Sequence, residues 1–187
     1  MEPRKWKAPR YTSELLNIPG MAFDVHIPDP KARIQAYIDS YDAPDMKGHK
    51  GFDEDFMRKH IKLENAWSDG QSAKAVFFLK VVPEYSNRMG NMHGGAMAMI
   101  YDMCTTMCAA PLARDDFWVF GGVSRTLSVT YLRPVRSSMD ILIECEVLQQ
   151  GRRLTTIRGQ MKDKSDGSLL SVAEHNKASI EFVNPKV

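Results

Sequence analysis

The stretch Asn87–Cys104, which reads NRMGNMHGGAMAMIYDMC, opens the only long apolar helix that the sequence predicts. A polar cluster precedes two glycines, and the residues that follow as far as Arg114 carry a single charge, Asp102. Apolar side chains occupy nearly every helical face of residues 94 to about 113, which predicts a helix that is buried almost all round. We expect the rest of the chain to pack around this helix.

The segments on either side of this helix alternate in character as strands do. One strand is expected within residues 72–85, and residues 52–70 predict a helix that runs into another strand. Four further strands are expected between 118 and 182, and alternation places Ser124 and Leu127 on opposite faces of the first of them. One helix wrapped by an antiparallel sheet is an α+β layout rather than an α/β one.

The length of 187 residues, of which 43% are hydrophobic, suits one compact domain with an extension. We predict that residues 1–69 form an N-terminal extension, with an irregular arm and short helices that pack on the domain. Within it, residues 31–44 have their apolar side chains at helical spacing and predict a short amphipathic helix. Residues 70–187 are predicted to form the domain itself.

The charge balance and the cysteines limit the classes of function. With 25 basic and 23 acidic residues, the chain gives no sign of a nucleic-acid partner. Its three cysteines lie in apolar surroundings and form no disulfide framework, which favours a reduced, intracellular setting. No segment approaches the roughly 20 apolar residues of a membrane span. We expect a cytoplasmic protein, with a mitochondrial location, suggested by the basic N-terminus, as the weaker alternative.

Asp102 is the first candidate for chemistry. A carboxylate on a buried helix costs several kcal/mol unless it is paired or hydrogen-bonded, and such groups are candidates for acid–base or nucleophilic work. The alternative is an aspartate that bonds to the local backbone or faces a wet edge. Cys104 and Cys108 lie four residues apart without a nearby histidine, so neither a metal site nor a cofactor is predicted.

His93, Gly94 and Gly95 open the predicted helix. The unpaired N–H groups of a first helical turn can polarise a carbonyl oxygen, although a plain tight turn into a helix gives the same pattern. Nine residues separate His93 from Asp102, which is a rise of about 13 Å with the side chains on nearly opposite sides. If both residues are catalytic, a two-fold related partner must bring its Asp102 to this chain's His93.

Asn87–Gly95, an aspartate nine residues after the histidine, and Gly122–Pro134 (GVSRTLSVTYLRP) together resemble a known family. It is the hotdog-fold acyl-CoA thioesterases of the PaaI and thioesterase superfamily member 2 type. The resemblance covers about residues 70 to 182. It implies a long central helix wrapped by a curved antiparallel sheet, assembly as a homodimer or a dimer of dimers, and hydrolysis of an acyl-CoA or acyl-carrier thioester without a metal.

The resemblance also implies roles for individual residues. Asp102 would act as general base or nucleophile across the dimer, and Asn87 would hold the attacking water or the thioester. His93 would help to orient the thioester, and the Gly94 N–H would polarise its carbonyl. Ser124 falls where the family has a polar residue that assists the water or the aspartate.

Substrate contacts are predicted from the chemistry of the side chains. The loop that contains Phe117 and Trp118 is longer and more aromatic than a bare helix-to-strand connection and is predicted to line the acyl tunnel. Methionines around the helix are either core filling or a plastic acyl-binding wall. The predicted substrate-binding residues are Gly95, Met103, Phe117, Trp118, Arg125, Arg133 and Arg136, and Arg152, Arg153 and Lys177 are further candidates for meeting phosphates.

Two other functions remain as alternatives to thioester hydrolysis. The same scaffold supports hydratases and dehydratases on acyl thioesters, because a fold does not determine a reaction. The long extension also suits a non-catalytic protein that binds acyl-CoA. The sequence does not give the length of the acyl chain or the number of subunits.

Overall fold

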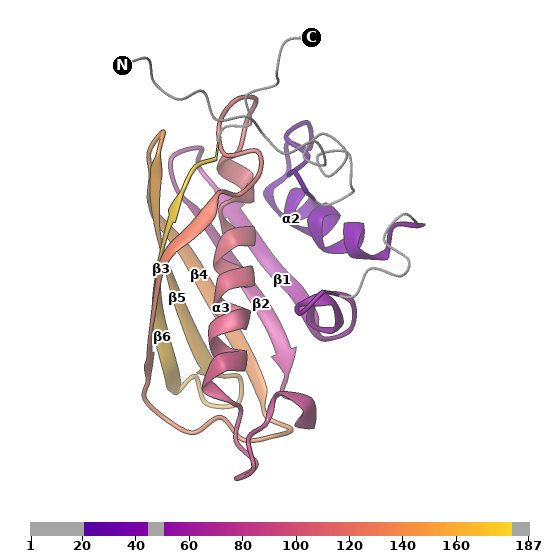
Figure 1. The fold of residues 1–187 in the computed structure, drawn as a ribbon, viewed down its shortest axis with the longest axis vertical. Coiled ribbons are helices and arrows are strands. Elements are labelled where there is room, and N and C mark those ends of the chain that lie inside the picture. Colours follow the sequence, from indigo (N-terminus) through magenta and orange to yellow (C-terminus); the bar gives the residue numbers. More distant parts are fainter. Residues whose placement is uncertain (1–20, 45–50, 181–187) are drawn as a thin grey trace, which may run out of the picture.

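The computed structural model describes residues 21–44 and 51–180, and within them a six-stranded antiparallel sheet curves around one long helix (Figure 1). The strand order is β1-β2-β4-β5-β6-β3, and α3 lies against one face of the sheet. The elements are α3 (Gly94–Cys108), β1 (Ile61–Ser68), β2 (Ala73–Lys80), β3 (Val123–Tyr131), β4 (Asp140–Gln150), β5 (Leu154–Asp163) and β6 (Leu169–Ala178). This arrangement confirms the predicted α+β hotdog layout.

Helix α3 begins where the sequence predicts. His93 is its N-cap in extended backbone, and its Nδ1 accepts the Gly95 N–H at 2.9 Å. The helix ends at Cys108 and passes into the 3-10 turn η5 (Ala110–Leu112). The prediction of burial almost all round holds for one side only, because Asp102 and its neighbours on the other side are half-buried.

The core lies between α3 and the inner face of the sheet. Strand β2 alternates regularly, with Phe77 and Leu79 buried against the helix and Lys74 and Lys80 exposed. On β5, a Cβ added at Gly159 would lie 2.6 Å from the Tyr101 ring, so this glycine allows α3 to approach the sheet closely. All three cysteines are buried and free, as predicted for core residues.

Strand β3 contains a bulge that corrects the predicted alternation. Its register with β6 shifts between Ser124, which lies opposite Lys177, and Thr126, which lies opposite Asn176. The extra residue, Arg125, reverses the alternation, so Ser124 and Leu127 point to the same inner face instead of opposite faces. The Ser124 hydroxyl is thereby directed at α3.

The N-terminal region packs beside α3. Helix α2 (Pro30–Asp39), capped by the Asp29 carboxylate, confirms the predicted amphipathic helix, and η1 (Ser40–Asp42) extends it. The π-helix η3 (Phe56–His60) then leads into β1, which pairs with β2 at the edge of the sheet. The remaining parts of the predicted extension, 1–20 and 45–50, lie outside the described residues.

Arg33 joins this region to the end of α3. Its side chain is 7% exposed, and its guanidinium donates only to backbone carbonyls. A buried cation whose three nitrogens all donate in this way ties the two segments together. The acceptors are the carbonyls of Val25, Ile27, Ala110, Pro111 and Ala113.

No helix among the described residues is long and apolar enough to cross a membrane.

Candidate active site

Asp102 lies near the middle of α3 at the centre of a polar cluster. Its side chain is 39% exposed. Ser124 on β3 donates its hydroxyl to Asp102 Oδ1 at 2.6 Å, and His175 Nε2 on β6 lies 3.3 Å from the same oxygen. The carboxylate therefore faces solvent on one side and side chains from two strands on the other, rather than bonding to the local backbone.

His175 is the fully buried member of this cluster. Its Nε2 lies 2.9 Å from Ser124 Oγ, and its Nδ1 lies 2.6 Å from Thr105 Oγ1 on α3. Both ring nitrogens are thus in contact with hydroxyl groups, one on each side of the ring. Burial, together with the charge of Lys177, lowers the pKa of His175 to about 4, although the Asp102 carboxylate opposes this effect. The imidazole is therefore neutral at physiological pH.

Lys177 lies beside His175 on the same face of β6. Its side chain is 3% exposed, and its Nζ donates to Thr106 Oγ1 at 2.7 Å. Burial lowers the pKa of Lys177, and Asp102 acts in the opposite direction. Lys177 is one of the basic residues that the sequence offers for phosphate contact, and the register of β6 turns its side chain inward.

A groove of about 460 Å³ opens beside the first turn of α3. Asn87, Gly94 and Arg133 are three of the predicted residues that line it. Asn87 Oδ1 accepts the N–H groups of Met89 at 2.8 Å and of Asn91 at 3.3 Å, so this side chain shapes the loop before the helix. The structure brings these three predicted residues to one groove, whereas Asp102 and Ser124 lie elsewhere on α3 and β3.

Gly94 has the geometry of a donor at the helix start. Its carbonyl accepts the Tyr131 hydroxyl at 2.9 Å, and a Cβ added at Gly94 would lie 3.2 Å from the Tyr131 ring. Within the described part of the chain its N–H has no acceptor, whereas the Gly95 N–H bonds to His93. A free N–H beside a groove can bind a carbonyl oxygen.

The remaining predicted residues lie at other places. Arg125 and Arg153 line a second hollow, of about 390 Å³, near the ends of β3, β5 and β6. Arg136 and Gly95 are exposed, and Met103 packs against the edge of the core. Their roles in substrate binding stay predictions.

The aromatic loop is well anchored. Trp118 is 4% exposed, and its Nε1 donates to the Gly151 carbonyl at 2.7 Å. Phe117 is half-buried, and the central carbon of the Arg114 guanidinium lies over its ring, 4.2 Å from the centroid of the ring. Trp118 is therefore held by the turn between β4 and β5, and none of the described cavities has either ring in its lining.

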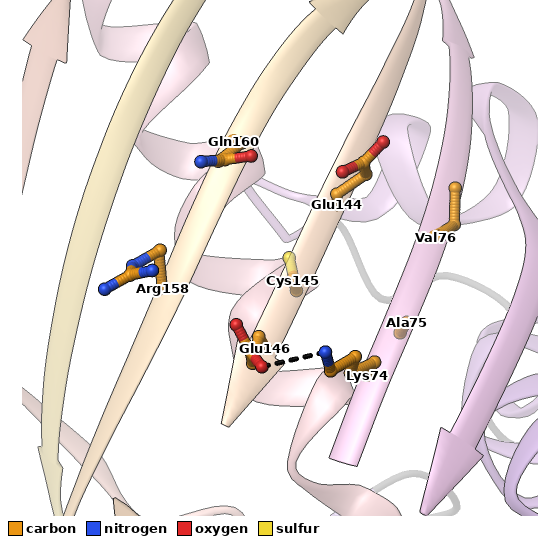
Figure 2. A pocket seen from close by; sticks show the side chains of 8 residues that line it. All are labelled: Lys74, Ala75, Val76, Glu144, Cys145, Glu146, Arg158 and Gln160. Carbon is orange, nitrogen blue, oxygen red and sulfur yellow. Dashed lines mark ion pairs between the residues drawn. The ribbon is translucent and has the colours of Figure 1, made fainter. Parts of the chain in front are cut away.

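A further hollow, of about 270 Å³, lies on the outer face of the sheet (Figure 2). Figure 2 shows charged side chains around it, with Lys74 and Glu146 forming an ion pair at 3.0 Å. Arg158 and Gln160 complete its polar rim, and no predicted site residue lines it. Alternating opposite charges of this kind are typical of a solvated sheet face.

Sequence reasoning missed His175 and the buried position of Lys177. The available signal was the alternation of β6, in which Ser171, Ala173, His175 and Lys177 share one face. A histidine and a lysine in phase with buried residues indicate a polar cluster inside the fold. Among the described residues, no group of histidine, cysteine and acidic side chains could hold a metal ion.

Comparisons with known proteins agree with this fold. The thioesterase superfamily matches residues 89–170. Human acyl-coenzyme A thioesterase 13 is 32% identical over 104 residues, which are 56% of this chain and 71% of the human protein. The crystal structure of zebrafish thioesterase superfamily member 2 is 28% identical, with a TM-score of 0.64 over 79% of this chain and 96% of that one.

A more distant structure shares the fold alone. It is a hypothetical thioesterase protein from Streptococcus pneumoniae, solved with coenzyme A, which is 23% identical with a TM-score of 0.55. The match covers 64% of this chain and 85% of that one. The central helix and the sheet therefore recur in a protein whose sequence differs at most positions.

Proposed function

The chain belongs to the thioesterase superfamily, and we propose that it hydrolyses acyl-CoA thioesters to a free carboxylic acid and CoA. Asp102 acts as general base or nucleophile, and the Gly94 N–H polarises the thioester carbonyl. The observation that carries the proposal is the half-exposed Asp102 carboxylate held by Ser124 at 2.6 Å. The name of the human relative, acyl-coenzyme A thioesterase 13, supports the choice of substrate.

The active site is shared between two subunits. Gly94 opens α3 and Asp102 lies eight residues later, so about 12 Å of helix rise separates them on one chain. A carbonyl bound at the Gly94 N–H can therefore meet the Asp102 of a two-fold related partner. A dimer then has two equivalent sites, each with the glycine of one chain and the aspartate of the other.

Strand β3 is the surface on which we propose that the two subunits meet. In the described part of the chain, β3 pairs only with β6 and so leaves one edge open. Val123, Tyr131 and Leu132 leave 47%, 51% and 48% of their surface exposed along or just after it. Open strand edges with apolar side chains tend to pair with another chain. Whether two dimers associate further stays a prediction.

The test is release of free thiol from short, long, aromatic and branched acyl-CoA substrates. Asp102→Asn keeps the size of the side chain but removes its basicity, so the rate should fall by about two to four orders of magnitude. Asp115→Asn, at an exposed position in the loop after α3, is the matched control and should retain full activity.

The same samples separate the alternative functions. Mass analysis that finds water gained or lost on the acyl chain, with the thioester intact, would indicate a hydratase or dehydratase. Calorimetric binding of acyl-CoA without turnover would indicate a binding protein. Equal thiol release by the wild-type protein and Asp102→Asn would refute the role proposed for Asp102.

A further inference from the structure

We propose that Tyr131 is a positioning residue for the Gly94 N–H: its hydroxyl holds the first turn of α3 so that this donor keeps a fixed direction beside the groove. The inference rests on the proposed function, in which the Gly94 N–H polarises the thioester carbonyl. It goes beyond that function because it assigns the rigidity of the donor to a side chain of another element, the last residue of β3. Figure 1 shows β3 at one edge of the sheet and α3 across the inner face of the sheet.

The start of α3 needs such support because its first two residues are glycines. Glycine loses more conformational freedom on folding than any other residue, so a turn that begins with two of them is difficult to hold in one conformation. A donor that stabilises developing negative charge must instead be fixed before the reaction begins. Contacts from outside the helix therefore have to supply the rigidity that the backbone of Gly94 and Gly95 lacks.

The peptide plane between Gly94 and Gly95 is held at both of its ends. Its carbonyl accepts the Tyr131 hydroxyl at 2.9 Å, and its N–H donates to His93 Nδ1 at 2.9 Å. Because a peptide unit is planar and stiff, bonds at its two opposite ends fix its orientation. The preceding peptide plane is held at the His93 carbonyl, which accepts the Met97 N–H at 3.1 Å, and its other end is the Gly94 N–H. Both planes that meet at the Gly94 Cα are thus anchored.

The Tyr131 ring lies close against the backbone of Gly94. A Cβ added at Gly94 would lie 3.2 Å from the ring and 3.2 Å from the hydroxyl oxygen, so a side chain at this position would have to move the tyrosine. Glycine thus allows the close approach that the hydrogen bond requires. Tyr131 also lines the groove of about 460 Å³ together with Gly94. The side chain that holds the donor is therefore part of the wall of the cavity that the donor adjoins.

The bulge in β3 makes this contact possible. Tyr131 lies seven residues after Ser124, and an uninterrupted strand would place the two side chains on opposite faces. The extra residue at Arg125 places them on the same inner face, with Ser124 bonded to Asp102 and Tyr131 bonded to Gly94. One strand therefore contacts both the middle and the start of α3, and it is the strand on which we propose that the two subunits meet.

An NMR measurement without substrate tests the hydrogen bond itself. The chain has two pairs of consecutive glycines, Gly94–Gly95 and Gly121–Gly122. When glycine is labelled with carbon-13 in its carbonyl and nitrogen-15 in its amide, a spectrum that correlates each carbonyl with the next N–H shows these two pairs alone. Tyr131→Phe keeps the ring but removes the hydroxyl, so the Gly94 carbonyl should lose a hydrogen bond and its signal should move to lower chemical shift. The Gly121 signal should stay in place as the internal control.

The two signals are assigned with Gly94→Ala, which removes the first glycine pair. An identical Gly94 signal in wild type and Tyr131→Phe would overturn the proposal, because the hydroxyl would then not hold the peptide. This measurement needs no enzymatic activity. It therefore remains informative even if the protein releases no thiol and the proposed function fails.

Steady-state thiol release tests the consequence for the reaction. A donor that acts in the transition state affects kcat rather than KM, so Tyr131→Phe should lower kcat about three- to tenfold with KM unchanged, a loss typical of one hydrogen bond. Tyr41→Phe is the matched control, because it removes a hydroxyl of η1 that donates to Asp53 Oδ2 at 2.6 Å, and it should match wild type. A Tyr131→Phe variant with the kcat of wild type, whether or not its KM changes, would refute the role of the Tyr131 hydroxyl.

Discussion

His175 lies in the polar cluster around Asp102, and its burial also affects the stability of the fold. In the unfolded chain it binds a proton near its usual pKa of about 6.5, whereas in the folded chain it does so only near 4. Between these two values the unfolded state holds more protons than the folded state. Protonation in this range therefore favours unfolding.

We expect this difference to be visible in the free energy of unfolding. As the pH falls from about 6.5 to 4, His175 should remove up to about 3 kcal/mol of stability, and above 6.5 its contribution should be constant. Urea unfolding at a series of pH values measures it. His175→Gln should remove this part of the pH dependence, and the exposed His26→Gln should retain it. Parallel curves for wild type and His175→Gln would contradict the prediction.

At the scale of the residue, sequence reasoning identifies the side chains that stand out from their neighbours. Asp102 is conspicuous as the one charge in an apolar helix. Ser124 is singled out only because the sequence around it resembles that of a known family. His175 and Lys177 lie in a segment rich in polar residues, where only the register shows which of them point inward. Lys177 was for this reason considered only as one of several basic residues that could meet a phosphate.

At the scale of the element, the start of α3 offers a substitution that removes a single N–H group. Gly94 occupies the first helical position after the N-cap His93, where proline is well tolerated. His93 has φ −66° and ψ 136°, which also suits the residue before a proline. Gly94→Pro should therefore preserve the helix while it removes the proposed donor to the thioester carbonyl.

We expect Gly94→Pro to lower kcat by about 10²- to 10³-fold, as loss of one oxyanion donor typically does. Gly94→Ala is the matched control, because it brings a similar Cβ within 3.2 Å of the Tyr131 ring but keeps the N–H. Steady-state thiol release measures both variants. Equal losses in the two variants would mean that crowding at Tyr131, and not the missing N–H, causes the effect.

Periodicity predicts the elements better than it predicts their details. The central helix, the short helix α2 and the six strands all follow from apolar spacing in the sequence. The bulge at Arg125 does not, because one extra residue in a strand leaves the local composition unchanged while it reverses every side chain on one side of it. That reversal is what brings Ser124 to Asp102.

At the scale of the whole molecule, the candidate site residues of the described chain form two separate groups. The groove at the start of α3 has Asn87, Gly94 and Arg133, and the cluster farther along the helix has Asp102, Ser124 and His175. The length of the helix already predicted this separation, because residues on a rigid rod cannot converge. The sequence does not predict the surface on which two copies are proposed to meet, since the open edge of β3 emerges only from the strand order.

The proposed sharing of the site between subunits predicts that two inactive variants restore each other's activity when their chains mix. Asp102→Asn and Gly94→Pro damage different halves of the site, so in a mixed dimer one site carries both changes and the other carries neither. After random exchange of subunits, half of the dimers are mixed and each has one intact site of two. The mixture should then regain about a quarter of the wild-type activity per chain, measured by thiol release.

Two controls are needed to interpret this experiment. Chains that carry both substitutions, mixed with wild-type chains, should show no gain in activity from exchange. In such a mixed dimer each of the two sites contains one substituted residue, so neither site is intact. Differently tagged subunits, purified through both tags after joint refolding, establish that exchange has taken place. If mixed dimers of Asp102→Asn and Gly94→Pro form and stay inactive, the two residues do not meet across an interface. In that case a glycine at one end of α3 and an aspartate at its middle would have to act separately, and the open edge of β3 would have no part in catalysis.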